Sequence, residues 1–132
     1  MQLKSLIFTV LMVAVLLISA CAPAATPTPA GSGQPQISLS TNPSPPTSNV
    51  QTELIIDALD AGGQPLTGAT VNILADMVGH SMGVMQGEAI EQGEGRYATF
   101  APFSMSGEWK VTVEVRNEDG LLLRQDVILP VQ

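Results

Sequence analysis

A strict alternation of side-chain types near the C-terminus constrains the fold of this chain more than any other feature. Apolar residues stand at every second position, as Trp109, Val111, Val113 and Val115, with polar or charged residues between them. A period of two places successive side chains on opposite faces of an extended strand. Residues 108–116 are therefore predicted to form a β-strand with one face buried and the other in water.

The same pattern predicts strands at 37–39, 50–58, 69–75, 96–100 and 121–129, with a weaker candidate at 84–90. Turn-forming residues separate them at 60–63, 93–95, 104–107 and 117–120, the last being a strong hairpin signal. No stretch has apolar residues at helical spacing. Six or seven short strands within about 100 residues are typical of an immunoglobulin-like antiparallel β-sandwich. We predict one all-β domain over residues 35–132.

Two aromatic residues are candidates for the core. Trp109, the sole tryptophan, heads the valine row and is predicted to fill the core rather than to form an exposed binding site. Tyr97 is ambiguous, because Ala98 and Phe100 occupy the opposite face of its strand.

The N-terminus predicts export and lipidation. Lys4 precedes an apolar run over residues 6–18, which has the length of a signal-peptide core and is short of the ~20 residues that span a bilayer. Ile18-Ser19-Ala20-Cys21 resembles the lipobox of bacterial lipoproteins, in which the cysteine thiol receives a diacylglyceryl lipid. We predict a signal peptide over 1–20 and a lipid-anchored mature chain on the extracytoplasmic, periplasmic face of a membrane. An ordinary signal peptide and an uncleaved signal anchor are the alternatives.

Composition limits the partners of the mature chain. Residues 21–34 hold the lipidated Cys21 and a spacer rich in Pro, Thr and Ala, which cannot build a core. The chain carries twelve Asp and Glu against five Lys and Arg, and one of those five is Lys4. Such a charge repels phosphate backbones and anionic headgroups. We therefore expect no nucleic-acid partner, and membrane contact through the lipid alone.

A hydrolase motif in the sequence is rejected. Residues 79–83 read Gly-His-Ser-Met-Gly, which matches the G-x-S-x-G nucleophile elbow. That motif needs a strand-to-helix turn in a large α/β sheet and a histidine from far downstream. His80, the sole histidine, adjoins the serine and leaves no separate base. We predict that the protein is not an enzyme.

The segment over residues 76–85 is the most informative for function. Met77, His80, Met82 and Met85 lie within it, and Met105 lies in a later turn. Neutral thioether sulfur favours Cu(I), and one imidazole can complete such a site. At strand spacing His80 and Met82 would project to the same side. Zinc is disfavoured because one histidine and no free cysteine are available. Alternatively, the methionines are flexible core fillers and the histidine is a solvated loop residue.

Several segments together resemble the YtkA-like family: residues 63–71, the Met/His segment, Gly95-Arg96-Tyr97, and residues 103–113, which read Phe-Ser-Met-Ser-Gly-Glu-Trp-Lys-Val-Thr-Val. These small extracytoplasmic immunoglobulin-like domains are similar in appearance to FixH proteins of oxidase assembly and often accompany copper-handling proteins. The resemblance implies the sandwich, and it implies copper-handling or oxidase-assembly proteins as partners. CopC-like copper carriers use several histidines, so His80 alone makes a tight Cu(II) site doubtful.

Two functions of different classes follow. In the first, the lipoprotein binds or relays copper, as Cu(I), through His80, Met82 and Met85, with Met77 or Met105 assisting. In the second, the domain is a metal-independent interaction module that docks on a membrane complex through a sheet edge or loop.

Overall fold

The computed structural model describes residues 33–80 and 83–132, which form an all-β domain. Its seven strands are β1 (Gln36–Asn42), β2 (Gln51–Leu59), β3 (Thr70–Met77), β4 (Met85–Gly93), β5 (Arg96–Pro102), β6 (Gly107–Asn117) and β7 (Gly120–Val131). Each corresponds to a strand expected from the sequence, so the predicted all-β class is confirmed. None of the described residues belongs to a helix of the length and hydropathy that a membrane span needs.

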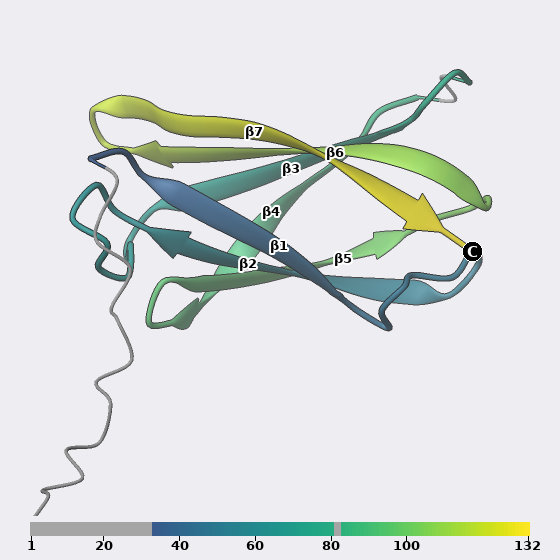
Figure 1. Cartoon of the computed structure of the whole chain (residues 1–132), viewed down its shortest axis with the longest axis horizontal. Coiled ribbons are helices and arrows are strands. Elements are labelled where there is room, and N and C mark those ends of the chain that lie inside the picture. The colour runs from purple at the N-terminus through teal and green to yellow at the C-terminus, as the bar shows by residue number, and fades with distance from the viewer. Residues whose placement is uncertain (1–32, 81–82) are drawn as a thin grey trace, which may run out of the picture.

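The strands form one continuous sheet that folds over into two layers (Figure 1). The strand order is β1-β2-β5-β4-β3-β6-β7, and every pairing is antiparallel. Strand β4 joins the layers, because its first half pairs with β3 and its second half pairs with β5. The domain is therefore a sandwich whose two layers share one strand.

Alternating side chains from both layers build the core. The predicted row on β6 is buried beside buried residues of its neighbour β3, and buried residues of β2 and β5 belong to the other layer. The largest completely enclosed apolar side chains in this core are Leu54, Ile56, Val71, Val111, Val113, Val115, Tyr97 and Phe103. The period-two pattern of the sequence thus sets which face of each strand is inside.

Trp109 fills one end of this core, as predicted. Its side chain is 3% exposed. Its ring meets Phe103 edge to face with centroids 5.2 Å apart, and its indole N–H donates to the backbone carbonyl of Met105 at 3.0 Å. Trp109 is therefore a packing residue whose one polar atom is satisfied.

Tyr97 is also buried, which decides the position that the sequence left ambiguous. Its hydroxyl donates to the carbonyl of Leu66 at 2.9 Å and accepts from the N–H of Ala69 at 3.2 Å. Burial raises the pKa of Tyr97, because desolvation disfavours the phenolate. The hydroxyl of Tyr97 therefore links β5 to the loop between β2 and β3, at Leu66 and Ala69.

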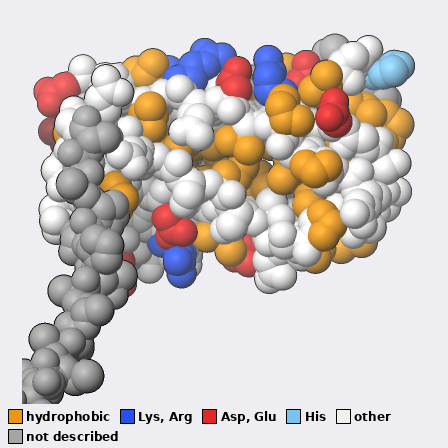
Figure 2. All heavy atoms as spheres, viewed as in Figure 1, with side chains coloured by type: hydrophobic (Ala, Val, Ile, Leu, Met, Phe, Trp, Pro, Cys, Tyr) orange, Lys and Arg blue, Asp and Glu red, His pale blue; other side chains and the backbone are white. Residues whose placement is uncertain are grey.

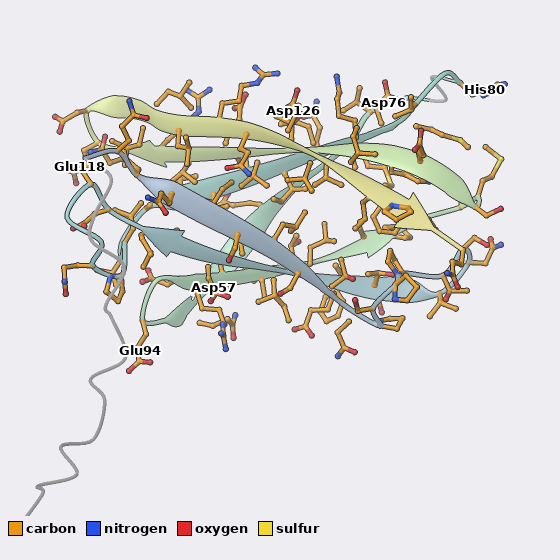
Figure 3. All side chains as sticks on the ribbon, viewed as in Figure 1. Asp57, Asp76, His80, Glu94, Glu118 and Asp126 are labelled. Carbon is orange, nitrogen blue, oxygen red and sulfur yellow. The ribbon has the colours of Figure 1, made fainter. Side chains whose placement is uncertain are left out.

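The two ends of the sandwich carry different features, and we name them here. The entry end holds the start of β1, the 60–63 turn, the 93–95 turn and the β6–β7 hairpin, since Gln36 pairs with Leu59 and Asn117 with Gly120. The tip end holds the β3–β4 hairpin loop over residues 78–84 and the end of β5. Figure 3 shows Glu94 and Glu118 at the entry end and His80 at the opposite end.

Candidate functional site

The Met/His segment forms the tip of the β3–β4 hairpin. Strand β3 ends at Met77 and β4 begins at Met85, so the connecting loop extends beyond the paired strands. His80 is exposed on this loop and points away from the body of the domain (Figure 3). Ser81 and Met82 lie outside the described residues, so the predicted placement of Met82 beside His80 stays a prediction.

A shallow surface hollow of about 560 Å³ lies at the base of this loop. It is lined by Asp76, Met77, Val78, Gly79, His80, Lys110 and Ile128. One imidazole, one thioether and one carboxylate therefore share this hollow. Its position is set by register, because Asp76 pairs with Lys110 and Lys110 pairs with Ile128 on the outer face of β3, β6 and β7.

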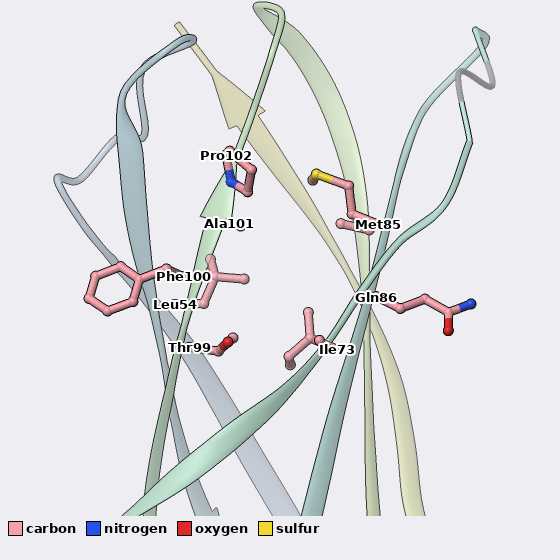
Figure 4. A pocket seen from close by; sticks show the side chains of 10 residues that line it. Leu54, Ile73, Met85, Gln86, Thr99, Phe100, Ala101 and Pro102 are labelled. Carbon is pink, nitrogen blue, oxygen red and sulfur yellow. The ribbon is translucent and has the colours of Figure 1, made fainter.

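Met85 and Met105 lie apart from this hollow. Met85 pairs with Ala75 and points between the layers into a different cleft (Figure 4). Met105 is half-buried in the loop between β5 and β6, where its carbonyl accepts the indole N–H of Trp109. Met77 packs over Gly107, since a Cβ built on that glycine would lie 2.7 Å from the Met77 Cε. His80 and Met77 thus border one hollow, but the Met77 side chain packs against the core and Gly107, and Met85 lines another cavity.

Carboxylates and histidine do not cluster anywhere in residues 33–80 and 83–132. No group of three or more His, Cys, Asp or Glu side chains there is positioned to hold a metal ion. Among the described side chains, thioether sulfur is the further donor that could join one imidazole. Gly79, His80 and Gly83 of the Gly-His-Ser-Met-Gly segment lie between the antiparallel strands β3 and β4, and no helix follows β3 in the described part of the chain.

A second cavity, of about 290 Å³, opens between β4 and β5 at the tip end. It is mainly apolar, with Leu54, Ile73 and Met85 among its lining residues. The sequence did not predict it, because it exists only where β4 passes from one layer to the other. Two sequence features could have indicated the cavity, although weakly. Gly87 stands in a strand with few apolar residues, and Phe100 lies on the opposite face of its strand from buried Tyr97.

Lys and Arg side chains are few, and those on the face drawn in Figure 2 lie in separate places. Arg116 and Arg124 contact Glu114 at 3.0 and 3.1 Å. Arg96 donates to Asp57 at 2.8 Å, and this hydrogen bond, together with the charge of Asp57, raises the pKa of Arg96. The ion pairs are exposed, so each contributes little to stability.

The sequence model of the YtkA-like family matches residues 30–114. The chain belongs to the YtkA-like family. The match covers β1 to β5 and most of β6, so the tip hairpin and the β4–β5 cavity both lie in the YtkA-like part of the chain. The resemblance expected from the sequence is thereby confirmed. A comparison with curated proteins found no match.

Proposed function

We propose that this YtkA-like domain is carried on an extracytoplasmic lipoprotein and binds or relays Cu(I) at the tip of its β3–β4 hairpin. The observation that supports the proposal best is the exposed His80 on a hollow that it shares with Met77. Met82 stands two residues from His80 in the same loop and supplies a second thioether.

The donor set suits a soft monovalent ion. Thioether and imidazole are neutral ligands, and thioether sulfur favours Cu(I) over the harder ions that carboxylates select. His80 and Met82 would hold the ion, with Met77 assisting from the border of the same hollow. An open loop with few donors suits transfer between proteins better than permanent storage. Acid should weaken binding, because a protonated imidazole is no longer a ligand.

The copper proposal is tested by competition for the metal. The full chain in mild detergent is titrated with Cu(I) against a chelator of known affinity, beside His80→Ala and Met82→Ala. We expect each substitution to weaken binding at least tenfold. Val78→Ala is the matched control, because it changes an exposed residue of the same loop without removing a donor. Equal affinities for the unchanged chain and both donor variants would exclude the site.

The same titration determines which of the other methionines, Met77, Met85 and Met105, contribute to Cu(I) binding. Met85→Leu and Met77→Leu keep apolar volume while removing sulfur. We expect Met77→Leu to weaken Cu(I) binding and Met85→Leu to leave it unchanged, since Met85 faces the other cavity. Met105→Leu should likewise have no effect. Loss of binding only in Met85→Leu or Met105→Leu would move the site away from the hairpin tip.

The anchor has its own test. Cys21 lies outside the described residues, and its role rests on the lipobox sequence. We expect the unchanged chain to have the intact mass of residues 21–132 plus a diacylglyceryl or acylated lipid, and Cys21→Ser to carry no lipid and to keep residues 1–20. An unchanged chain with the mass of residues 1–132 and no lipid would identify a signal anchor instead.

A further inference from the structure

The cavity between β4 and β5 has open strand edges on both sides, and we call it the seam. Residues 85–89 of β4 pair only with β3, and residues 99–102 of β5 pair only with β2. The two strands pair with each other only from Ile90↔Ala98 to Gly93↔Arg96. Each seam edge therefore presents backbone N–H and C=O groups that have no sheet partner, which is the feature that accepts an added strand.

The inner side of the seam is apolar. Figure 4 shows Met85 and Ile73 on one wall pointing towards Leu54 and Thr99 on the other. Gly87 stands between them on β4 and contributes no side chain, and a Cβ built there would lie 3.6 Å from the Thr99 Oγ1. A glycine in a strand marks a place where another backbone can come close.

The outer rim of the seam combines apolar and acidic side chains. Phe100 points away from the cavity (Figure 4) and is 60% exposed, and Ile90 is 70% exposed. Glu53 pairs with Phe100 across β2 and β5, and Glu88 is exposed on the open stretch of β4. Neither glutamate forms a salt bridge with any described residue.

Cations from the domain itself do not neutralise this rim. Arg96 is paired with Asp57 near the entry end, and the other described cations lie on the outer face of β6 and β7, namely Lys110, Arg116 and Arg124. The seam therefore has two chemically different sides: an apolar interior and an anionic exterior.

We infer that the seam binds an extended segment of a partner protein, in which apolar and basic side chains alternate, by pairing with the open edge of β4. In such a strand successive side chains point in opposite directions. The apolar set enters the cavity against Met85 and Leu54. The basic set meets Glu53, Glu88 and the ring of Phe100. This surface does not depend on the copper proposal.

The direct test uses synthetic peptides and the full chain in mild detergent. A labelled seven-residue peptide of alternating Lys and Val is titrated by fluorescence anisotropy. Its comparison peptide has the same composition with all Lys before all Val, and a third peptide carries Glu in place of Lys. We expect the alternating Lys/Val peptide to bind at least tenfold tighter than either. Two further versions carry methyl groups on the backbone nitrogens of all Val or of all Lys residues, so each blocks one edge of the strand. We expect the version that blocks the edge facing β4 to lose binding, and equal binding of both methylated versions and the unmethylated peptide would contradict strand pairing.

Variants of the chain locate the contact. Gly87→Val fills the seam, and the fold should tolerate it because the glycine has no positive φ and the new Cβ makes only an ordinary contact with Thr99. We expect it to abolish peptide binding, whereas Ser38→Val, an exposed outward position on β1, should not. Phe100→Ser and Glu88→Gln should each weaken binding several-fold, and Leu121→Ser on β7 is the control for loss of an exposed apolar residue.

Three further outcomes would overturn the inference. The first is equal binding of the alternating and block peptides, which would indicate charge attraction alone. The second is equal peptide affinity in Gly87→Val and the unchanged chain. The third is self-association of the unchanged chain in sedimentation that Gly87→Val abolishes, which would make a second copy the occupant of the seam. Amide NMR shifts confined to residues 86–88 and 98–101 on addition of the alternating peptide would support it.

Discussion

At the entry end of the sandwich, hydrogen bonds join side chains and backbone from several strands, whereas at the tip end β4 separates from β5. The hydroxyl of Tyr97 bonds the backbone at Leu66 and Ala69, and the N–H of Ala58 donates to the carbonyl of Gly95 at 2.8 Å. At the tip end the seam opens and the hairpin loop exposes Val78, His80 and Val84. Regions with few buried contacts open most easily and commonly carry binding sites. Trp109 and Phe103 also pack at the tip end, so within that end the seam and the hairpin loop are the parts best placed for recognition.

The largest effect that tests this comparison of the two ends is expected at Gly95. Its φ is +74°, and a Cβ there would lie 2.6 Å from the carbonyl oxygen of Ala58. Gly95→Ala should therefore lower the free energy of unfolding by about 3 kcal/mol or more, measured by urea denaturation. Gly79→Ala at the tip end is the matched control, because its φ is +82° but nothing lies within 4 Å of the new Cβ. It should cost only about 1–2 kcal/mol. Equal costs at the two glycines would remove the distinction.

Tyr97→Phe should have the next largest effect. It keeps the ring in the core and removes the hydroxyl that serves Leu66 and Ala69. Leaving these backbone groups without their partner should lower the free energy of unfolding by about 1–3 kcal/mol. Amide hydrogen exchange should quicken at Ala69 and not at Trp109. A loss of protection spread evenly over both ends would contradict a local role for Tyr97.

The pH dependence of stability gives a third, smaller effect. The pKa of Tyr97 is raised in the folded state because burial disfavours the phenolate. A raised folded-state pKa gives stability that is complete below the unfolded-state value of about 10 and is lost as pH rises through the folded-state value. The unchanged chain should therefore lose more stability above pH 10 than Tyr97→Phe does. Since Tyr97 is the only tyrosine, the absorbance of its tyrosinate form reports the same titration. If the free energy of unfolding falls equally with pH in both proteins above pH 10, the proposed contribution of Tyr97 is refuted.

The smallest effects are expected at the tip. Val78→Ser and Val84→Ser change exposed side chains at a loop with no buried neighbours to lose. Each should alter the free energy of unfolding by less than about 0.5 kcal/mol. A loss of 2 kcal/mol or more from either would mean that the hairpin tip supports the core, and it would make the loop a poor candidate for an independent metal site.

Much of the fold was predictable because local chemistry determines it. Alternation on β6 predicted its buried face, and the Asn117 side chain caps the predicted β6–β7 turn by accepting from the N–H groups of Asp119 and Gly120. The seam was not predictable, because local sequence does not show where β4 ends its pairing with the strand before it and begins its pairing with the strand after it. Phe100 shows most clearly that residue type alone does not predict which side chain is buried. It is more apolar than Tyr97, yet Tyr97 is buried because its hydroxyl finds backbone partners about thirty residues away.

The candidate metal ligands divide in the same way. The sequence placed His80 and Met77 in one segment, and both border one hollow, although Met77 pairs with buried Trp109 and packs against the core. Met85 belongs to the same segment but begins β4, where pairing with Ala75 turns its side chain inward. Closeness in sequence therefore did not give closeness in space, because a strand sends neighbouring side chains to opposite faces.

β1 begins at the entry end, whereas His80 lies at the opposite, tip end. This placement affects where a partner protein could meet His80. Under the proposed lipid anchor, the chain leaves the membrane through a spacer that reaches at most ~40 Å, and the sandwich adds roughly another 40 Å along a strand of twelve residues such as β7. His80 then stands at the far pole of the molecule, facing the aqueous compartment. A copper donor or acceptor would have to present its own site at a similar distance from the membrane surface. A water-soluble carrier or a large extramembrane domain therefore fits this distance better than a site inside the bilayer.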